Sequence, residues 1–186
     1  MPATRKVAVL VGSLRKDSLN RKMALAMARL APPSLALEVV EIGQLPHYNA
    51  DYEADPPREV REFKARIEAA DAVLFVTPEY NRSVPGVLKN AIDVGSRPYG
   101  KSSWSRKPAA VVSVSPGALG AFGANQHLRQ SFVFLDMPAL QQPEAYIGNA
   151  ASLFDESGQL TNASTREFAQ KFLSAYEQWI ERNAAT

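Results

Sequence analysis

Cysteine is absent from the 186 residues of this chain. Its absence excludes disulfide bonds, thiolate catalysis and cysteine-ligated zinc or iron–sulfur clusters. Histidine is scarce as well: only His47 and His127 are present, and neither stands in an HExxH-type pattern. We therefore expect no metal site. A chain without cysteine suits a reducing compartment, and we expect a cytoplasmic location.

The chain also lacks a strong charge of either sign and any long hydrophobic run. Its formal net charge is +2, so nothing indicates electrostatic binding to nucleic acid. No apolar run approaches the length of a membrane span, and the polar start MPATRK is not that of a signal peptide. With 46% hydrophobic and 22% charged residues, we expect one soluble globular domain over residues 1–186.

Apolar runs alternate with helical patterns along the chain. Val7–Val11, Ala72–Val76 and Ala109–Val114 are continuous apolar runs, typical of strands buried on both faces of a sheet. Two less distinct strands are predicted at residues 35–42 and within residues 139–147. Helices are predicted at residues 18–30, 55–70, 83–95 and 164–182, with a further helix carrying Leu128, Phe132 and Leu135. Ser83 and Ser164 are the expected caps of two of them.

This alternation predicts an open parallel sheet with helices on both faces. Five such units fit an α/β, flavodoxin-like fold with the strand order 2-1-3-4-5. The six-stranded dinucleotide-binding arrangement is the alternative, but it needs more chain and a different first turn. In the five-stranded order, ligands bind beyond the carboxyl ends of the strands, between strands one and three.

The loop after the first strand, GSLRKDSLN, is rich in hydrogen-bond donors. Backbone N–H groups at the start of the following helix lack internal partners and favour a phosphate. Ser13, Ser18 and Asn20 can donate to phosphate oxygens, and Arg15 adds charge and a planar donor fork. Without GxxxxGK[ST] or GxGxxG, the loop suits one monophosphate, as in flavin mononucleotide (FMN). The alternative is that these residues only cap the helix.

The loop after the third predicted strand, TPEYNRS, suits a flat heteroaromatic ring. Pro78, Glu79, Tyr80 and Asn81 offer backbone amides, an aromatic side chain and a carboxamide. Amides beside the carbonyl groups of a flavin would stabilise negative charge on the reduced ring. Alternatively, Pro78 shapes a turn and Tyr80 packs against a neighbouring subunit.

A third loop, SPGALG, follows the fourth predicted strand and contains Ser115, Gly117 and Gly120. Glycine permits close approach of the backbone to a ligand. Because the same composition occurs in flexible loops, this interpretation depends on the other two loops.

Three segments in this order resemble the NADPH-dependent FMN reductase family, in its branch of bacterial quinone and chromate reductases. They are GSLRKDSLNRKMA, TPEYNRSVPGVLKNAID and SPGALGAFGANQHLRQSFVFLDMP. With the flanking pattern, the resemblance covers nearly the whole chain. It implies a flavodoxin-like fold, bound FMN and a homodimer or homotetramer.

The resemblance also implies roles for individual residues. The FMN phosphate would be held by Ser13, Arg15, Ser18 and Asn20. The isoalloxazine ring would be lined by Pro78, Glu79, Tyr80 and Asn81. Its pyrimidine side or the ribityl chain would be approached by Ser115, Gly117 and Gly120. Arg129 and Glu144 look like family residues used between subunits.

Two departures from the family pattern concern packing. Relatives often carry tryptophan after Ile-Asp, where this chain has Val94-Gly95. Relatives often have paired glycines after the SPG turn, where this chain has Ala121. Neither departure affects the predicted phosphate donors.

The activity implied by the resemblance is two-electron, ping-pong transfer from NADPH or NADH to a quinone, and more promiscuously to chromate or azo compounds. We assign no catalytic side chain, since the cofactor carries the chemistry. For Glu79, a structural or subunit-interface role is favoured over proton donation. The alternative function is an FMN-binding electron carrier that does not oxidise NAD(P)H itself, although such carriers usually have a strongly acidic docking face. A vestigial cleft in a non-enzymatic protein is a further alternative, and the intact donor set opposes it.

Overall fold

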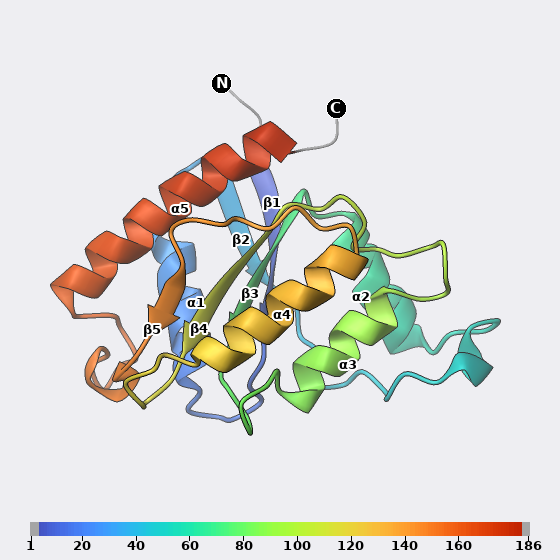
Figure 1. Ribbon diagram of the computed structural model, residues 1–186, viewed down its shortest axis with the longest axis horizontal. Coiled ribbons are helices and arrows are strands. Elements are labelled where there is room, and N and C mark those ends of the chain that lie inside the picture. The colour runs from blue at the N-terminus through green and yellow to red at the C-terminus, as the bar shows by residue number, and fades with distance from the viewer. Residues whose placement is uncertain (1–3, 184–186) are drawn as a thin grey trace.

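Five parallel strands form one sheet with the order β2-β1-β3-β4-β5, seen in a computed structural model that describes residues 4–183 (Figure 1). The strands are β1 (Arg5–Val11), β2 (Leu35–Val39), β3 (Ala72–Thr77), β4 (Ala109–Val114) and β5 (Ala145–Ile147). This order confirms the predicted flavodoxin-like fold class. Residues 1–3 and 184–186 of the expected domain lie outside the described part of the chain.

Five α-helices and two short 3-10 helices accompany the strands within residues 4–183. They are α1 (Leu19–Leu30), η1 (Ala50–Tyr52), α2 (Arg58–Glu68), α3 (Gly86–Gly95), α4 (Phe122–Phe134), η2 (Ala150–Ser152) and α5 (Ala163–Asn183). None of the helices described is both long enough and apolar enough to cross a bilayer.

Two of the predicted helix caps were wrong. Helix α3 begins after Pro85 with no side-chain cap, and Ser83 lies in the turn before it. Helix α5 begins at Ala163, one residue earlier than predicted, so the capping position moves to Asn162. The Asn162 Oδ1 atom accepts a hydrogen bond from the backbone N–H of Thr165 at 3.0 Å.

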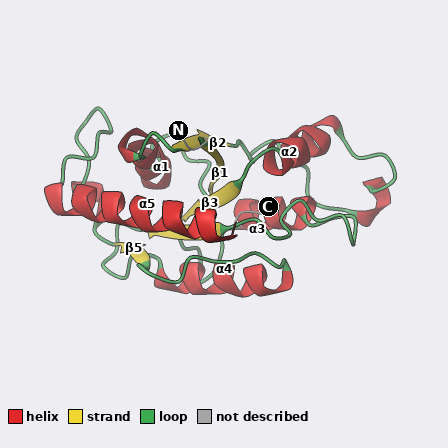
Figure 2. Ribbon diagram, turned by 90° about the horizontal axis from the view of Figure 1, so that it is seen from above, coloured by secondary structure: helices red, strands yellow, loops and turns green. Residues whose placement is uncertain are grey.

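Helices cover both faces of the sheet, as Figure 2 shows from above. The core on one face combines side chains of the strands with α1 and α5, including Met23, Phe172 and Tyr176. The core on the other face combines the strands with α2, α3 and α4, including Phe63 and Leu88. Every residue of β3 and β4 is buried. Each fully buried large apolar side chain contributes about 1.5–3 kcal/mol, so these central strands fix the sheet.

The departure at Val94-Gly95 has a packing explanation. Trp104 is fully buried, and a Cβ atom at Gly95 would lie 2.5 Å from its ring. The indole N–H of Trp104 donates to the carbonyl oxygen of Ile92 at 2.9 Å. An aromatic side chain from the loop before β4 thus occupies the space beside the end of α3, and Gly95 leaves room for it.

Because all strands run in the same direction, the loops after β1, β3 and β4 gather at one edge of the sheet. This edge lies at the bottom of Figure 1, opposite the two ends of the described chain. The three loops that the sequence singled out are therefore the three that meet at the carboxyl edge of the central strands.

Candidate functional site: the carboxyl edge of the sheet

The loops after β1 and β3 are in direct contact at Gly12. The backbone N–H of Gly12 donates to the carbonyl oxygen of Val76 at 2.9 Å. A Cβ atom at Gly12 would lie 3.1 Å from the Thr77 hydroxyl and 3.2 Å from the Pro78 ring. These contacts are tighter than ordinary packing, so glycine here lets the two loops approach each other.

The β1–α1 loop presents a set of donors with few internal partners. Ser13 and Ser18 are buried, with 8% and 3% of their surface exposed, whereas Arg15 is exposed. Ser18 accepts a hydrogen bond from the backbone N–H of Arg21 at 3.2 Å, so it caps α1, the role that the sequence analysis gave as the alternative to phosphate binding. Its own hydroxyl proton remains available to a ligand. Within residues 4–183, no acceptor is bonded to the backbone N–H groups of residues 13–17.

Asn20 lies in the first turn of α1 and is only 4% exposed. Its amide nitrogen donates to the carbonyl oxygen of Val114, at the end of β4, at 3.2 Å. Its Oδ1 atom is buried without a hydrogen-bond partner in the described structure. A buried oxygen without a partner costs about 1–3 kcal/mol, so this acceptor is suited to a ligand that brings a donor. Asn20 also links the start of α1 to the third loop of the edge.

The β3–α3 loop forms a tight turn at its tip. Backbone hydrogen bonds of 3.1 and 3.0 Å join Tyr80 and Ser83. Asn81 and Arg82, between them, have φ angles of 51° and 64°. Two central residues with positive φ are the signature of a type I′ turn. The turn leaves the Tyr80 side chain half exposed and Asn81 exposed at the edge, while Pro78 is half-buried at its base.

The Glu79 side chain points to α4. Its carboxylate accepts a hydrogen bond from the backbone N–H of Ala124 at 3.1 Å. It is therefore the backbone of Glu79, with Pro78, Tyr80 and Asn81, that stays at the carboxyl edge.

The β4–α4 loop is held against β5. Ser115 bonds locally, its hydroxyl oxygen accepting from the N–H of Gly117 at 3.1 Å. Gly120 has a φ of 58°, and a Cβ atom there would lie 2.6 Å from the carbonyl carbon of Tyr146. The close approach made by Gly120 is thus to β5, while Gly117 remains exposed. Burial raises the pKa of the Tyr146 hydroxyl.

The second departure from the family pattern falls on a residue with left-handed backbone geometry. Ala121 has a φ of 60°, a conformation that glycine adopts without strain and alanine does not. The loop nevertheless closes in this chain, at a cost of about 1–2 kcal/mol.

A buried polar network beneath the β4–α4 loop escaped the sequence analysis. The Ser113 hydroxyl donates to the carbonyl oxygen of Gly120 at 2.6 Å, and the Asn125 amide donates to Ser113 at 3.2 Å. Arg129 donates to Asn125 Oδ1 at 3.0 Å and to the carbonyl oxygen of Leu140 at 2.9 Å. No sequence pattern predicts these partners, because the network joins β4, the loop after it, α4 and Leu140. Arg129 thus has partners within the chain, and its predicted role between subunits stays a prediction, like that of Glu144.

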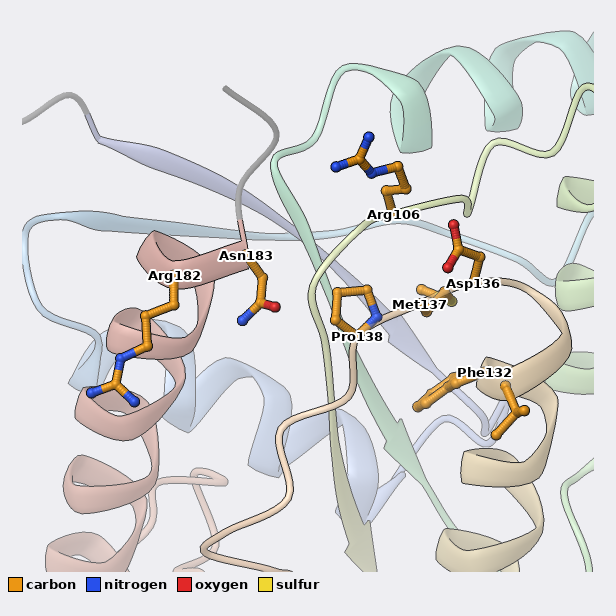
Figure 3. A pocket seen from close by; sticks show the side chains of 8 residues that line it. Arg106, Phe132, Asp136, Met137, Pro138, Arg182 and Asn183 are labelled. Carbon is orange, nitrogen blue, oxygen red and sulfur yellow. The ribbon is translucent and has the colours of Figure 1, made fainter.

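A cavity of about 410 Å³ lies at the opposite edge of the sheet, where α4 and α5 end. Arg106, Asp136 and Arg182 lie on its rim, and Phe132, Met137 and Pro138 form its apolar part. Figure 3 shows the two guanidinium groups pointing in different directions, so they do not converge on one anion. The candidate site is therefore at the carboxyl edge.

The chain is similar to proteins of known activity over most or all of its length. A quinone reductase of Pseudomonas putida is 64% identical to the chain over 186 residues, covering 100% of both proteins. A 2-hydroxy-1,4-benzoquinone reductase of Burkholderia sp is 47% identical over 175 residues, covering 94% of this chain and 96% of that protein. FerB, a flavoenzyme NAD(P)H:(acceptor) oxidoreductase from Paracoccus denitrificans, has a similar solved structure. Its TM-score is 0.92 at 47% identity, and the match covers 98% of this chain and 100% of FerB.

Residues 5–152 match the family model described as NADPH-dependent FMN reductase. That match covers most of the chain, including the three loops at the carboxyl edge, and it confirms the resemblance drawn from the sequence. The chain belongs to the NADPH-dependent FMN reductase family.

Proposed function

We propose that this chain is an FMN-dependent NAD(P)H:quinone reductase built as a single flavodoxin-like domain. The observation that carries the proposal is the donor set of the β1–α1 loop, which lies at the point where the strand order reverses. NAD(P)H is an intracellular reductant, which supports the expected cytoplasmic location.

The donor set fits a phosphate monoester. Ser13 and Ser18 offer buried hydroxyl groups, and the backbone N–H groups of residues 13–17 have no acceptor within the described chain. Helix α1 carries no acidic residue in its first turn, so nothing there offsets the positive end of the helix. Arg15 has no carboxylate within ion-pair distance among residues 4–183. These residues would hold the FMN phosphate.

Asn20 fits a different part of the same ligand. Its amide nitrogen is already bonded to Val114, and the atom without a partner is the Oδ1 acceptor. A phosphate oxygen cannot donate to it, whereas a hydroxyl group can. We therefore move Asn20 from the phosphate to a ribityl hydroxyl of FMN, which still places it in the cofactor site.

Residues of the other two loops would line the ring and its approaches. Tyr80 is half exposed at the tip of the β3–α3 turn, beside Asn81, and Pro78 stands at the base next to Gly12. Gly117 and Ser115 form the facing loop, with Gly120 packed beneath it. When bound there, FMN supplies the redox chemistry, accepting electrons from NAD(P)H and passing them to the acceptor. The protein binds, orients and partly shields the ring.

A quinone is the proposed acceptor, since two relatives that match 100% and 94% of the chain are named quinone reductase and 2-hydroxy-1,4-benzoquinone reductase. We further propose that NAD(P)H and the quinone bind in turn at the same open side of the site, which gives ping-pong kinetics. Reduction of chromate or azo compounds stays a prediction for the same site.

Colour tests this function directly. After incubation with FMN and removal of unbound FMN, the purified protein should be yellow and should lose that colour when NADPH or NADH is added without oxygen. Addition of a benzoquinone should restore the colour, and initial rates should give parallel double-reciprocal plots. A yellow protein that NAD(P)H does not bleach would be an electron carrier. A protein that stays colourless after incubation with FMN would have no functional site.

A homodimer or homotetramer is part of the proposal. Its support is a group of large apolar side chains on and near α4 that the single chain leaves in water, with Val133 84%, Phe134 77% and Tyr99 82% exposed. Exposed apolar side chains that gather in one patch are typical of protein–protein interfaces. Light scattering should give a mass of two or four chains, and Val133→Asp combined with Phe134→Asp should lower it. A single-chain mass for the unmodified protein would contradict this part.

A further inference from the structure

The β3–α3 turn contains one residue whose side chain does not favour its backbone conformation. Asn81 and Arg82 both have positive φ angles, and neither is glycine. Asparagine tolerates this region, but arginine makes no compensating local hydrogen bond there, so Arg82 costs about 1–2 kcal/mol. A turn of this kind persists only where contacts outside it hold it in place.

The Glu79 carboxylate provides one such contact. It accepts a hydrogen bond from the backbone N–H of Ala124 at 3.1 Å, and its other oxygen lies 3.5 Å from the Arg82 guanidinium. The Glu79 side chain is only 15% exposed, so water competes weakly for its bond to Ala124, whereas the Arg82 side chain is 77% exposed and its ion pair is the weaker contact. One carboxylate thus connects the turn, its strained arginine and α4.

The Ala124 N–H needs this acceptor. Helix α4 begins after Ala121, which has no side-chain cap, and the first intrahelical bond runs from Asn125 to Ala121. The N–H of Ala124 therefore lies among the first-turn donors that lack an internal acceptor. A carboxylate from another loop occupies the capping position, where negative charge is also favoured by the helix.

Gly123 allows the Glu79 carboxylate and the β3–α3 turn to lie close against the start of α4. A Cβ atom at position 123 would lie 2.9 Å from Glu79 Oε2 and 3.0 Å from the carbonyl oxygen of Arg82. Any larger residue would push the turn away from α4. A second contact lies one helical turn further along, where His127 Nδ1 and the Ser83 hydroxyl are 3.0 Å apart.

We propose that Glu79 is a positioning residue: by capping α4, its carboxylate holds the β3–α3 turn in the conformation that presents Tyr80 and Asn81 to the cofactor. The inference rests on the proposed function for the identity of that cofactor. It assigns Glu79 no proton transfer, since the side chain acts as a hydrogen-bond acceptor directed at α4.

The test compares Glu79→Ala, Glu79→Gln and Gly123→Ala. Glutamine keeps an acceptor oxygen and should rescue the contact, while alanine removes it. We expect Glu79→Ala and Gly123→Ala to raise the FMN dissociation constant about five- to twentyfold, and Glu79→Gln to raise it less than about threefold. The visible circular dichroism of bound FMN should change in the first two variants and be retained in Glu79→Gln.

Two matched controls separate this effect from general ones. Gly86→Ala adds the same methyl group at the start of α3, where nothing lies within 4 Å of the new atom. Glu62→Ala removes another carboxylate paired with an arginine, on the exposed face of α2. Both should leave the dissociation constant and the spectrum unchanged.

Amide hydrogen exchange, measured in the FMN-free protein, tests the contact between Glu79 and α4 without relying on the proposed function. Amides of residues 121–127 should exchange faster in Glu79→Ala than in the unmodified protein. If the unmodified protein binds no FMN, the proposed function fails while this measurement still tests the contact with α4. Unchanged exchange in Glu79→Ala would overturn the inference. So would equal loss of turnover in Glu79→Ala and Glu79→Gln with FMN affinity and spectrum intact, because that result assigns a chemical role to the carboxyl group.

Discussion

Replacing Asn20 by leucine should separate folding from cofactor binding. The side chains are similar in size, and Asn20 is buried with one amide end bonded and the other without a partner. The substitution leaves the Val114 carbonyl oxygen without this donor, which costs about 1–3 kcal/mol, and removes the unpaired Asn20 oxygen, which regains about 1–3 kcal/mol. These two effects oppose each other, so the FMN-free protein should keep its free energy of unfolding to within about 1–2 kcal/mol.

The complex with FMN should respond differently. If Oδ1 of Asn20 accepts a hydrogen bond from the ligand, leucine forfeits about 1–3 kcal/mol of binding, which raises the dissociation constant about 5- to 150-fold. Fluorescence titration measures that constant. Urea unfolding of the FMN-free protein measures its stability.

Asn90 offers a matched control. Its Oδ1 accepts from the N–H of Tyr48 at 2.9 Å, and its amide nitrogen donates to the carbonyl oxygen of Pro46 at 3.0 Å. Asn90→Leu should therefore destabilise the FMN-free protein by about 2 kcal/mol and leave the FMN dissociation constant unchanged. The reasoning about Asn20 is refuted if Asn20→Leu behaves like Asn90→Leu, losing stability without losing affinity.

Three further predictions concern the phosphate donors, the core and the pH dependence of stability. Ser13→Ala combined with Arg15→Ala should raise the dissociation constant of FMN about 30-fold or more and leave that of riboflavin unchanged. The control Lys16→Ala should change neither constant. Equal effects of the double variant on FMN and riboflavin would contradict a phosphate role. Trp104→Ala should lower the free energy of unfolding by about 3–5 kcal/mol in urea, because it empties the space beside α3, and a loss below about 1.5 kcal/mol would argue against that packing. Burial lowers the pKa of Lys64 in the folded protein below its ordinary value of 10.5. Between the folded and unfolded pKa values the unfolded chain binds more protons, so the free energy of unfolding should rise with pH up to about 10.5, relative to that of Lys64→Met. Parallel curves of unfolding free energy against pH for the two proteins would contradict this prediction.

The central strands could be predicted from the sequence because burial on both faces leaves a continuous apolar run. The strand Ala109–Val114 was predicted and found with the same bounds. The strand predicted at Ala72–Val76 ends one residue later, at Thr77. The outer strands were less distinct: β2 ends at Val39, and β5 has only three residues. An edge strand is paired on one side only, so its composition is less constrained.

The three loops at the carboxyl edge could also be predicted, since donors and glycines are local features. The contacts that orient them could not. The cap that Glu79 provides for α4, the left-handed Asn81 and Arg82, and the unpaired oxygen of Asn20 all depend on segments far apart in the chain. Trp104 filling the space beside Gly95 is of the same kind. Sequence periodicity carries no information on such partners.

The central claim is that the β1–α1 loop holds a single phosphate monoester. The most direct measurement is the ratio of dissociation constants for riboflavin and FMN, which differ only in that phosphate. Two or more charge-assisted hydrogen bonds of about 1.5–3 kcal/mol each predict that FMN binds at least about 100-fold more tightly. Equal affinity for the two ligands would contradict the account.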